Sequence, residues 1–188
     1  VRDRSGDVSE TVRAKVGLKE VTWDGGVLKV NGFPVKLRGV NHHDISPENG
    51  RAVTDAEQWR DVRLIKDANC NFIRTSHYPP SKALLDACDR LGILVIEENR
   101  LTGINSMHTE LLERMIRRDR NHPSIILWGV GNEEWGLEWN DFGRRIAESM
   151  REYCHRFDPS RLMSVASSSG PNILVPADVA GYNYILQN

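Results

Sequence analysis

Two hydrophobic periods alternate along this chain, one typical of strands and one typical of helices. The clearest strand signal is the continuous apolar run at 125–130, a pattern typical of a parallel strand buried on both faces. Pro123 ends the element before it, because proline disfavours a helical conformation at His122. Further short apolar runs predict strands at 36–41, 70–75, 93–96, 161–166 and 179–184.

Between these runs, apolar residues recur at helical spacing. Thr54 and Glu57 form a capping box that predicts the start of one helix, and Gly92 predicts the end of the next. Two more helices are expected at 107–120 and 141–157. Strands that alternate with helices predict an α/β fold, with a parallel sheet and right-handed crossovers.

The amino-terminal part carries β signals of a different kind. Apolar and polar residues alternate at 12–18, which predicts one half-buried strand. Asn31 and Gly32 stand between two short apolar runs, which predicts a hairpin within 23–35. We expect the role of this hairpin to be structural.

Composition limits the size of the fold and the class of partner. The chain has 188 residues, of which 39% are hydrophobic and 27% charged, as in an ordinary globular unit. Its net charge of −1 gives no electrostatic basis for binding nucleic acid or an anionic membrane. The three cysteines match no metal-binding spacing and are expected to be buried free thiols. No cofactor is indicated, and the absence of a targeting pattern leaves the compartment unassigned.

Polar residues follow several predicted strands at the end where an α/β barrel places its active site. Asn132, Glu133 and Glu134 follow the buried run at 125–130. Burying a carboxylate there is costly unless the site uses it. Taken alone, such a pair of glutamates is either structural or catalytic.

The segments at 37–43, 71–79, 92–99 and 121–135 resemble, in this order, motifs of glycoside hydrolase family 2. This family includes the β-galactosidases and β-glucuronidases. The resemblance implies a partial (β/α)8 TIM barrel of about six parallel strands, truncated before the seventh. Residues 1–20 would be the remnant of a preceding immunoglobulin-like β-sandwich domain. Residues 21–188 would be the incomplete catalytic barrel, with the hairpin closing its bottom.

The resemblance implies hydrolysis of β-linked glycosides with retention, which needs two carboxyl groups about 5 to 5.5 Å apart. It assigns the acid/base to Glu133, and strand alternation directs only one of Glu133 and Glu134 into the pocket. Asn132 corresponds to the asparagine that binds the sugar 2-hydroxyl. The family's nucleophile is a glutamate at the end of the seventh strand, so no residue of this chain is assigned that role.

Three more residues correspond to family positions near the reacting sugar. Arg74 would lie under the nucleophile and keep it ionised, by opposite-charge stabilisation. The alternative for Arg74 is a structural ion pair with Glu97 or Glu98. Asn183 and Tyr184 would lie near the scissile bond, at the end of the sixth strand.

The histidines allow two interpretations. By resemblance, His43 and His77 would lie at the sugar pocket, although each could instead be a hydrogen-bonded packing residue, and His42 would be structural. Some β-galactosidases hold magnesium shortly after the third strand, but neither ligand is present at 101–104, so we expect no metal. A weaker hypothesis is a metal protein that uses His42, His43, Asp44 and His77.

These patterns together predict a piece of a β-galactosidase-like glycosidase whose partner is a β-glycoside substrate. It would carry the acid/base but not the nucleophile, and would be inactive or nearly so on its own. The sugar preference is not predicted. The alternative is an inactive fragment that binds carbohydrate or self-associates as a homo-oligomer, because unpaired strand edges seek partners.

Overall fold

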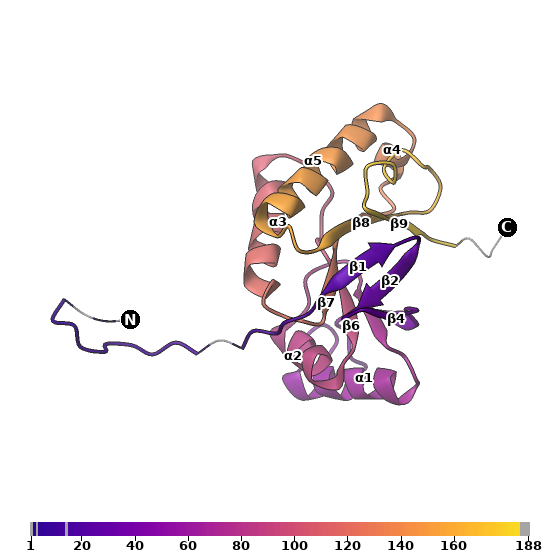
Figure 1. Ribbon diagram of the computed structural model, residues 1–188. Coiled ribbons are helices and arrows are strands. Elements are labelled where there is room, and N and C mark those ends of the chain that lie inside the picture. Colours follow the sequence, from indigo (N-terminus) through magenta and orange to yellow (C-terminus); the bar gives the residue numbers. More distant parts are fainter. Residues whose placement is uncertain (1, 3, 14, 185–188) are drawn as a thin grey trace.

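The computed structural model describes residues 2, 4–13 and 15–184, which form two sheets and five helices (Figure 1). The larger sheet has six parallel strands whose order in space follows their order in the chain. They are β4 (Gly39–His42), β5 (Phe72–Thr75), β6 (Leu94–Glu98), β7 (Ile125–Asn132), β8 (Leu162–Ser167) and β9 (Val179–Tyr182). The predicted α/β fold is confirmed, with strand boundaries shifted by a few residues.

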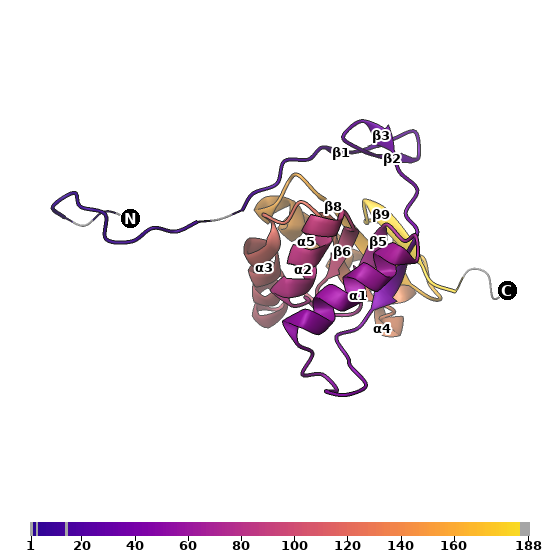
Figure 2. The same ribbon diagram turned by 90° about the horizontal axis from the view of Figure 1, so that it is seen from below.

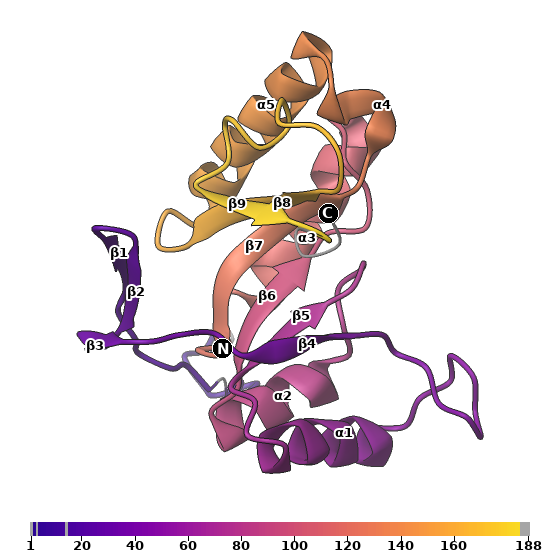
Figure 3. The same cartoon turned by 90° about the vertical axis from the view of Figure 1, so that its right-hand side faces the viewer.

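The helices lie outside a curved sheet, so the strands form part of a barrel (Figure 3). They are α1 (Asp55–Asp67), α2 (Lys82–Leu91), α3 (Ser106–Asp119), α4 (Trp135–Glu138) and α5 (Asp141–Phe157). The sheet stays open between β4 and β9, which are its two edge strands in the described part of the chain. This curled half-barrel agrees with the predicted partial TIM barrel.

Local sequence signals explain where the helices begin and end. The capping box of Thr54 and Glu57 is present at the start of α1. Gly92 ends α2 in the left-handed conformation, with a φ of 70° that favours glycine. Helix α4 has only four residues, too few to produce a helical period, and was not predicted.

A small antiparallel sheet covers the end of the barrel where the parallel strands begin (Figures 2 and 3). Its strands are β1 (Val21–Asp24), β2 (Val27–Val30) and β3 (Phe33–Pro34). Leu28 of β2 is buried and packs in one cluster with Ile126 and Leu127 of β7. The predicted hairpin is therefore present, and it closes the bottom of the half-barrel.

The strand predicted at 12–18 is absent from the described residues, among which position 14 is not included. Residues 4–13 extend away from the body in Figures 1 and 2, whereas Lys15, Val16 and Gly17 line a pocket together with residues of α2 and of the turn before β7. Val12, Val16 and Leu18 are 72%, 65% and 94% exposed. A two-residue alternation produces a strand only where a neighbouring strand supplies hydrogen bonds, and none of the described residues does so here.

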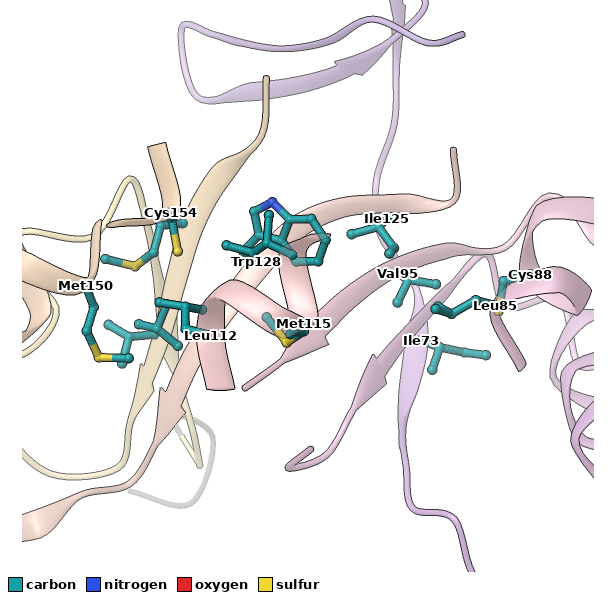
Figure 4. Close-up of a cluster of buried hydrophobic side chains, with 14 of the residues drawn as sticks. Ile73, Leu85, Cys88, Val95, Leu112, Met115, Ile125, Trp128, Met150 and Cys154 are labelled. Atoms are coloured by element: carbon teal, nitrogen blue, oxygen red, sulfur yellow. The ribbon is translucent and has the colours of Figure 1, made fainter. Parts of the chain in front are cut away.

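The core is built on both faces of β7, as its apolar sequence predicted. Trp128 and Ile125 pack on one side with residues from α2, α3 and α5 (Figure 4). Ile126 and Leu127 pack on the other side, inside the barrel. Trp128 is fully buried and its indole N–H donates to Asp158 over 3.0 Å, so this large side chain leaves no unpaired donor.

The cysteines are free thiols, as predicted, but only two of them are buried. Cys70 is half-buried, whereas Cys88 and Cys154 are buried, and burial raises the pKa of both these thiols. The helices in the described part of the chain include none with the length and apolar character needed to cross a bilayer.

Candidate active site

A cleft of about 330 Å³ lies at the carboxyl ends of the parallel strands. Side chains that are distant in the sequence meet there because parallel strands end at the same edge of the sheet. Residues from β4, β5, β7 and β9 and from the segments that follow them line the cleft: Asn41, Arg74, His77, Asn132, Glu133, Tyr182, Asn183 and Tyr184.

Glu133 directly follows β7 and is held by both its backbone and its side chain. Its φ of 52° lies in the left-handed region, which non-glycine residues rarely adopt. Its backbone N–H donates to the carbonyl of Ala166 over 3.0 Å, and its side-chain Oε1 accepts a hydrogen bond from Asn183 Nδ2 over 2.5 Å. The adjacent Glu134 does not line the cleft and instead precedes α4 as its N-cap residue.

Asn132 and Arg74 form the floor of the cleft. The Oδ1 atom of Asn132 accepts hydrogen bonds from Arg74 Nη2, over 2.6 Å, and from Asn183 Nδ2, over 3.0 Å. Arg74 is paired in register with Asn41 on the neighbouring strand, and its Nη1 lies 3.4 Å from Asn41 Oδ1. One network therefore joins side chains from β4, β5, β7 and the segment after β9.

Glu98 supports this network from beneath and is almost completely buried. Its Oε1 accepts from Arg74 Nε over 2.5 Å, and its Oε2 lies 2.8 Å from His77 Nδ1. A carboxylate can only accept, so Nδ1–H of His77 is the donor, and Nε2 lies on the other side of the ring. The ion pair suggested as the alternative role of Arg74 is thus present, with Glu98 and not with Glu97.

Glu97 points to the opposite face of β6, toward α3. It is fully buried next to Asp119, and Arg118 Nη2 lies 3.6 Å from its Oε1. Burial, together with the neighbouring charge of Asp119, raises the pKa of Glu97 well above its ordinary value. Strand alternation thus separates two adjacent glutamates, one beneath the cleft and one in the interior behind it.

The histidines near the cleft differ in their contacts. His43 does not line the cleft, but its ring packs edge to face on that of His77, with 5.4 Å between the centroids. Burial, followed by the nearby His77 and Arg51, lowers the pKa of His43 below its ordinary value. His42 instead bonds Asp61, with 3.2 Å between Nε2 and Oδ2, which suits the structural role expected for it.

The metal hypothesis is not supported by the arrangement of its residues. In the described part of the chain, one group of at least three potential ligands is close enough to share an ion, and it consists of Asp86, Asp89 and His122. This group lies at α2 and the turn before β7 rather than at the cleft. It shares no member with the proposed set of His42, His43, Asp44 and His77.

Sequence reasoning gave no role at the cleft to three residues, of which it named Glu98 only as a possible ion-pair partner of Arg74. Asn41 and Tyr182 line the cleft, and Glu98 supports it. The signal for Glu98 was present, because alternation along β6 must send one of its two glutamates toward the barrel interior. The sequence alone did not show which of the two it would be.

Comparison with known proteins gives a consistent result. Residues 21–109 and 104–181 match the family model "Glycosyl hydrolases family 2, TIM barrel domain". A β-galactosidase of Lactococcus lactis subsp. lactis is 36% identical over 173 residues, which are 85% of this chain and 17% of that protein. A β-galactosidase of Thermoanaerobacter pseudethanolicus is 38% identical over 163 residues, 82% of this chain and 21% of that protein.

Solved structures agree with the sequence matches. A family 2 glycosyl hydrolase of Bacteroides cellulosilyticus superposes with a TM-score of 0.83 at 34% identity, covering 92% of this chain and 25% of that one. The β-glucuronidase of Parabacteroides merdae gives a TM-score of 0.80 at 30% identity, covering 89% of this chain and 22% of that one. The chain therefore spans between 17% and 25% of the length of these relatives.

Proposed function

Since this chain belongs to glycoside hydrolase family 2, we propose that it carries the acid/base half of the active site of a retaining, β-galactosidase-like enzyme. The observation that carries the proposal is the hydrogen bond of 2.5 Å from Asn183 to Glu133 within the cleft. It fixes the carboxyl group that would protonate the leaving oxygen and later remove a proton from water.

The orientation of Asn132 supports a role in holding the sugar. Its Oδ1 is occupied by Arg74 and Asn183, and no described residue accepts a hydrogen bond from its Nδ2. The amide N–H groups are therefore left to donate to a substrate hydroxyl, which suits the proposed contact with the sugar 2-hydroxyl. Tyr184 lines the same cleft and would lie near the scissile bond.

We assign the nucleophile to no described residue. Both oxygens of Glu98 are engaged, one by Arg74 and one by His77, and the residue is only 2% exposed. Glu98 would therefore position these two side chains rather than attack the sugar. We propose that the nucleophile belongs to the part of the parent protein that follows the sixth strand, and that Arg74 keeps it ionised.

A neutral sugar fits the charges of the cleft better than a uronic acid. Arg74 is the cationic side chain among the described lining residues; it is paired with Glu98, and its remaining N–H groups would face the proposed nucleophile. A uronate carboxylate would find no unpaired Lys or Arg there. This charge balance favours β-galactosidase-like over β-glucuronidase-like specificity.

The domain boundary is also proposed from the resemblance. Residues 1–20 would belong to a preceding immunoglobulin-like domain and residues 21–188 to the catalytic barrel. The exposed side chains of Val12 and Leu18 support this, since apolar residues of a strand are normally covered by the rest of its own sheet.

The decisive experiment uses a longer chain that continues through the seventh and eighth strands. Hydrolysis would be measured on aryl β-galactosides, β-glucuronides and β-mannosides, with Glu133→Gln beside its matched neighbour Glu134→Gln. Loss of an acid/base typically costs about 10²- to 10⁴-fold in rate. We expect that loss from Glu133→Gln alone, and a smaller loss on nitrophenyl glycosides, whose leaving group needs little protonation. Equal effects of the two substitutions would refute the assignment.

A second candidate function is assembly through the sheet edges. β4 and β9 are edge strands, and Val40 and Tyr182 on them are 40% and 62% exposed. Such edges can pair with another copy or with a complementing segment.

A further inference from the structure

Two exposed tryptophans lie beside the candidate acid/base. Trp135 and Trp139 are 73% and 64% exposed, and both follow Glu133 closely in the chain, on α4 and at its carboxyl end. They are four positions apart, so they lie on the same side of the short helix. Large exposed aromatic side chains that lie together often mark a binding surface.

Hydrogen bonds fix both indole groups to the loop between β8 and β9. Trp135 Nε1 donates to Ser168 Oγ over 3.2 Å, and Trp139 Nε1 donates to Ser169 Oγ over 3.0 Å. Figures 1 and 3 show α4 next to this loop. The polar edge of each ring is thus satisfied within the protein, and what stays exposed is mainly apolar ring surface.

A buried carboxylate holds the loop in turn. Glu138 lies between the two tryptophans in sequence, is 0% exposed, and accepts hydrogen bonds from the backbone N–H groups of Ser168, Ser169 and Gly170. It also accepts from Ser169 Oγ over 2.5 Å. Burial raises the pKa of Glu138, but these hydrogen bonds outweigh that effect and lower the pKa below its ordinary value. The buried carboxylate of Glu138 therefore fixes Ser168 and Ser169, which accept the hydrogen bonds from the two indole rings.

The surface borders the side of the cleft on which Glu133 lies. The backbone N–H of Trp135 donates to the carbonyl of Glu133 over 3.0 Å. On the other side, the backbone N–H of Asn183 donates to the carbonyl of Ser167, the residue before Ser168, also over 3.0 Å. A general acid lies next to the oxygen of the leaving group, so the leaving group must occupy this side of the cleft.

We propose that Trp135 and Trp139 bind the leaving-group sugar of a β-linked oligosaccharide, as a subsite adjoining the cleft. This rests on the function proposed above. A pyranose ring has an apolar face of C–H groups and a rim of hydroxyls, so it can pack on an indole while its hydroxyls stay in water. Rings already held by Ser168, Ser169 and Glu138 lose little freedom on binding, which favours affinity.

The test measures binding rather than hydrolysis, on the 188-residue chain itself. Saturation-transfer NMR would report the affinity for lactose and for methyl β-galactoside, which lacks the second sugar. We expect Trp135→Ala and Trp139→Ala each to weaken lactose binding by about three- to tenfold, the range of one aromatic contact. Trp23→Ala is the matched control, because Trp23 is 50% exposed but lies on β1 in the small sheet.

The outcomes are separable. The proposal is overturned if the wild type does not bind lactose, or if Trp135→Ala and Trp139→Ala both bind lactose as well as the wild type does. A change in the oligomeric state of the Trp135→Ala and Trp139→Ala variants without a change in lactose affinity assigns the surface to contact with another copy of the chain and also overturns the proposal. If lactose binding depends on Trp135 and Trp139 but the longer chain is inactive, the subsite is supported and the hydrolase function is refuted. The two proposals can therefore fail independently.

Discussion

Asn183 Nδ2 lies 2.5 Å from Glu133 Oε1, although 50 positions separate the two residues in the chain. The same amide nitrogen also donates to Asn132 Oδ1 over 3.0 Å. One side chain at the end of the sixth barrel strand therefore sets the position of two neighbouring residues at the end of the fourth. This arrangement depends on the curvature of the sheet, because β9 and β7 are separated by β8.

Replacing Asn183 is expected to impair catalysis more than folding. In a longer, active chain, Asn183→Ala should lower kcat/KM for an aryl β-galactoside by about 10- to 100-fold, since leaving the partners of a lost hydrogen bond unsatisfied costs about 1–3 kcal/mol. Steady-state kinetics and urea unfolding would be measured together. Asn121→Ala is the control, because Asn121 is exposed at the opposite end of the strands. A loss of stability that accounts for the whole loss of activity would contradict this prediction.

The sequence predicted those parts of the molecule that depend on local patterns. The buried strand with Trp128 followed from one continuous apolar run, and α1 from its capping box. Glu133 and Asn183 were placed at strand ends by the same patterns, together with the family resemblance. Their mutual contact was not predicted, because it depends on how strongly the sheet curls.

Other features could not be read from the sequence for identifiable reasons. Helix α4 is too short for a periodic signal, so the arrangement of Trp135 and Trp139 was missed. The alternation at 12–18 suggested a strand, but no described residue pairs with it. The choice between Glu97 and Glu98 depended on the exact register of β6, which two adjacent identical residues conceal.

Gly129 is expected to be essential for the support beneath the cleft. A Cβ atom at this position would lie 2.6 Å from Glu98 Cγ and 3.3 Å from Glu98 Cα. Gly129→Ala should therefore displace the carboxylate that holds Arg74 and His77, and overpacking of this kind costs about 1–3 kcal/mol. Urea unfolding of the 188-residue chain would measure the loss.

Gly136→Ala provides the matched comparison for this substitution. A Cβ at Gly136 would meet nothing within 4 Å, and alanine is favoured over glycine in a helix by up to about 1 kcal/mol. We expect this variant to be as stable as the wild type or slightly more stable. If Gly129→Ala and Gly136→Ala had equal free energies of unfolding, Glu98 would move away from the added methyl group without loss of stability, and the prediction for Gly129 would be wrong.

The open edges of the barrel predict concentration-dependent self-association. The monomer has a mass of 21.3 kDa, and light scattering should report a larger average mass as the concentration rises. Val40→Lys on β4 should reduce this association, because a charge on an edge strand opposes pairing. Val27→Lys on β2 is the control, since Val27 is similarly exposed, at 43% against 40%. A constant monomeric mass at all concentrations would exclude assembly through these edges.

His122 and Asp89 predict a stability that depends on pH. His122 Nδ1 lies 2.6 Å from Asp89 Oδ2, and Asp89 Oδ1 accepts from the backbone N–H of Ser124, so the pair ties α2 to the start of β7. The hydrogen bond to Asp89 raises the pKa of His122. Burial raises the pKa of Asp89, but its hydrogen bonds to His122 and Ser124 lower it below the ordinary value overall.

The sign of the effect follows from these two directions. A raised histidine pKa gives stability that is complete below the unfolded value of about 6.5 and is lost as the pH rises through the folded value. A lowered aspartate pKa gives stability that is complete above about 3.9 and is lost as the pH falls through the folded value. The pair should therefore stabilise the fold most between about pH 4 and 6.5.

His122→Gln measures this contribution directly. By urea unfolding, we expect it to lower the free energy of unfolding by about 1 kcal/mol more at pH 5.5 than at pH 9, because the charged imidazole gains more from Asp89 than the neutral one. His108→Gln is the control, since His108 contacts the uncharged amide of Asn105 rather than a carboxylate. If the His122 variant lost the same stability at both pH values, the pair would act through packing rather than through charge, and the link between α2 and β7 would not depend on protonation.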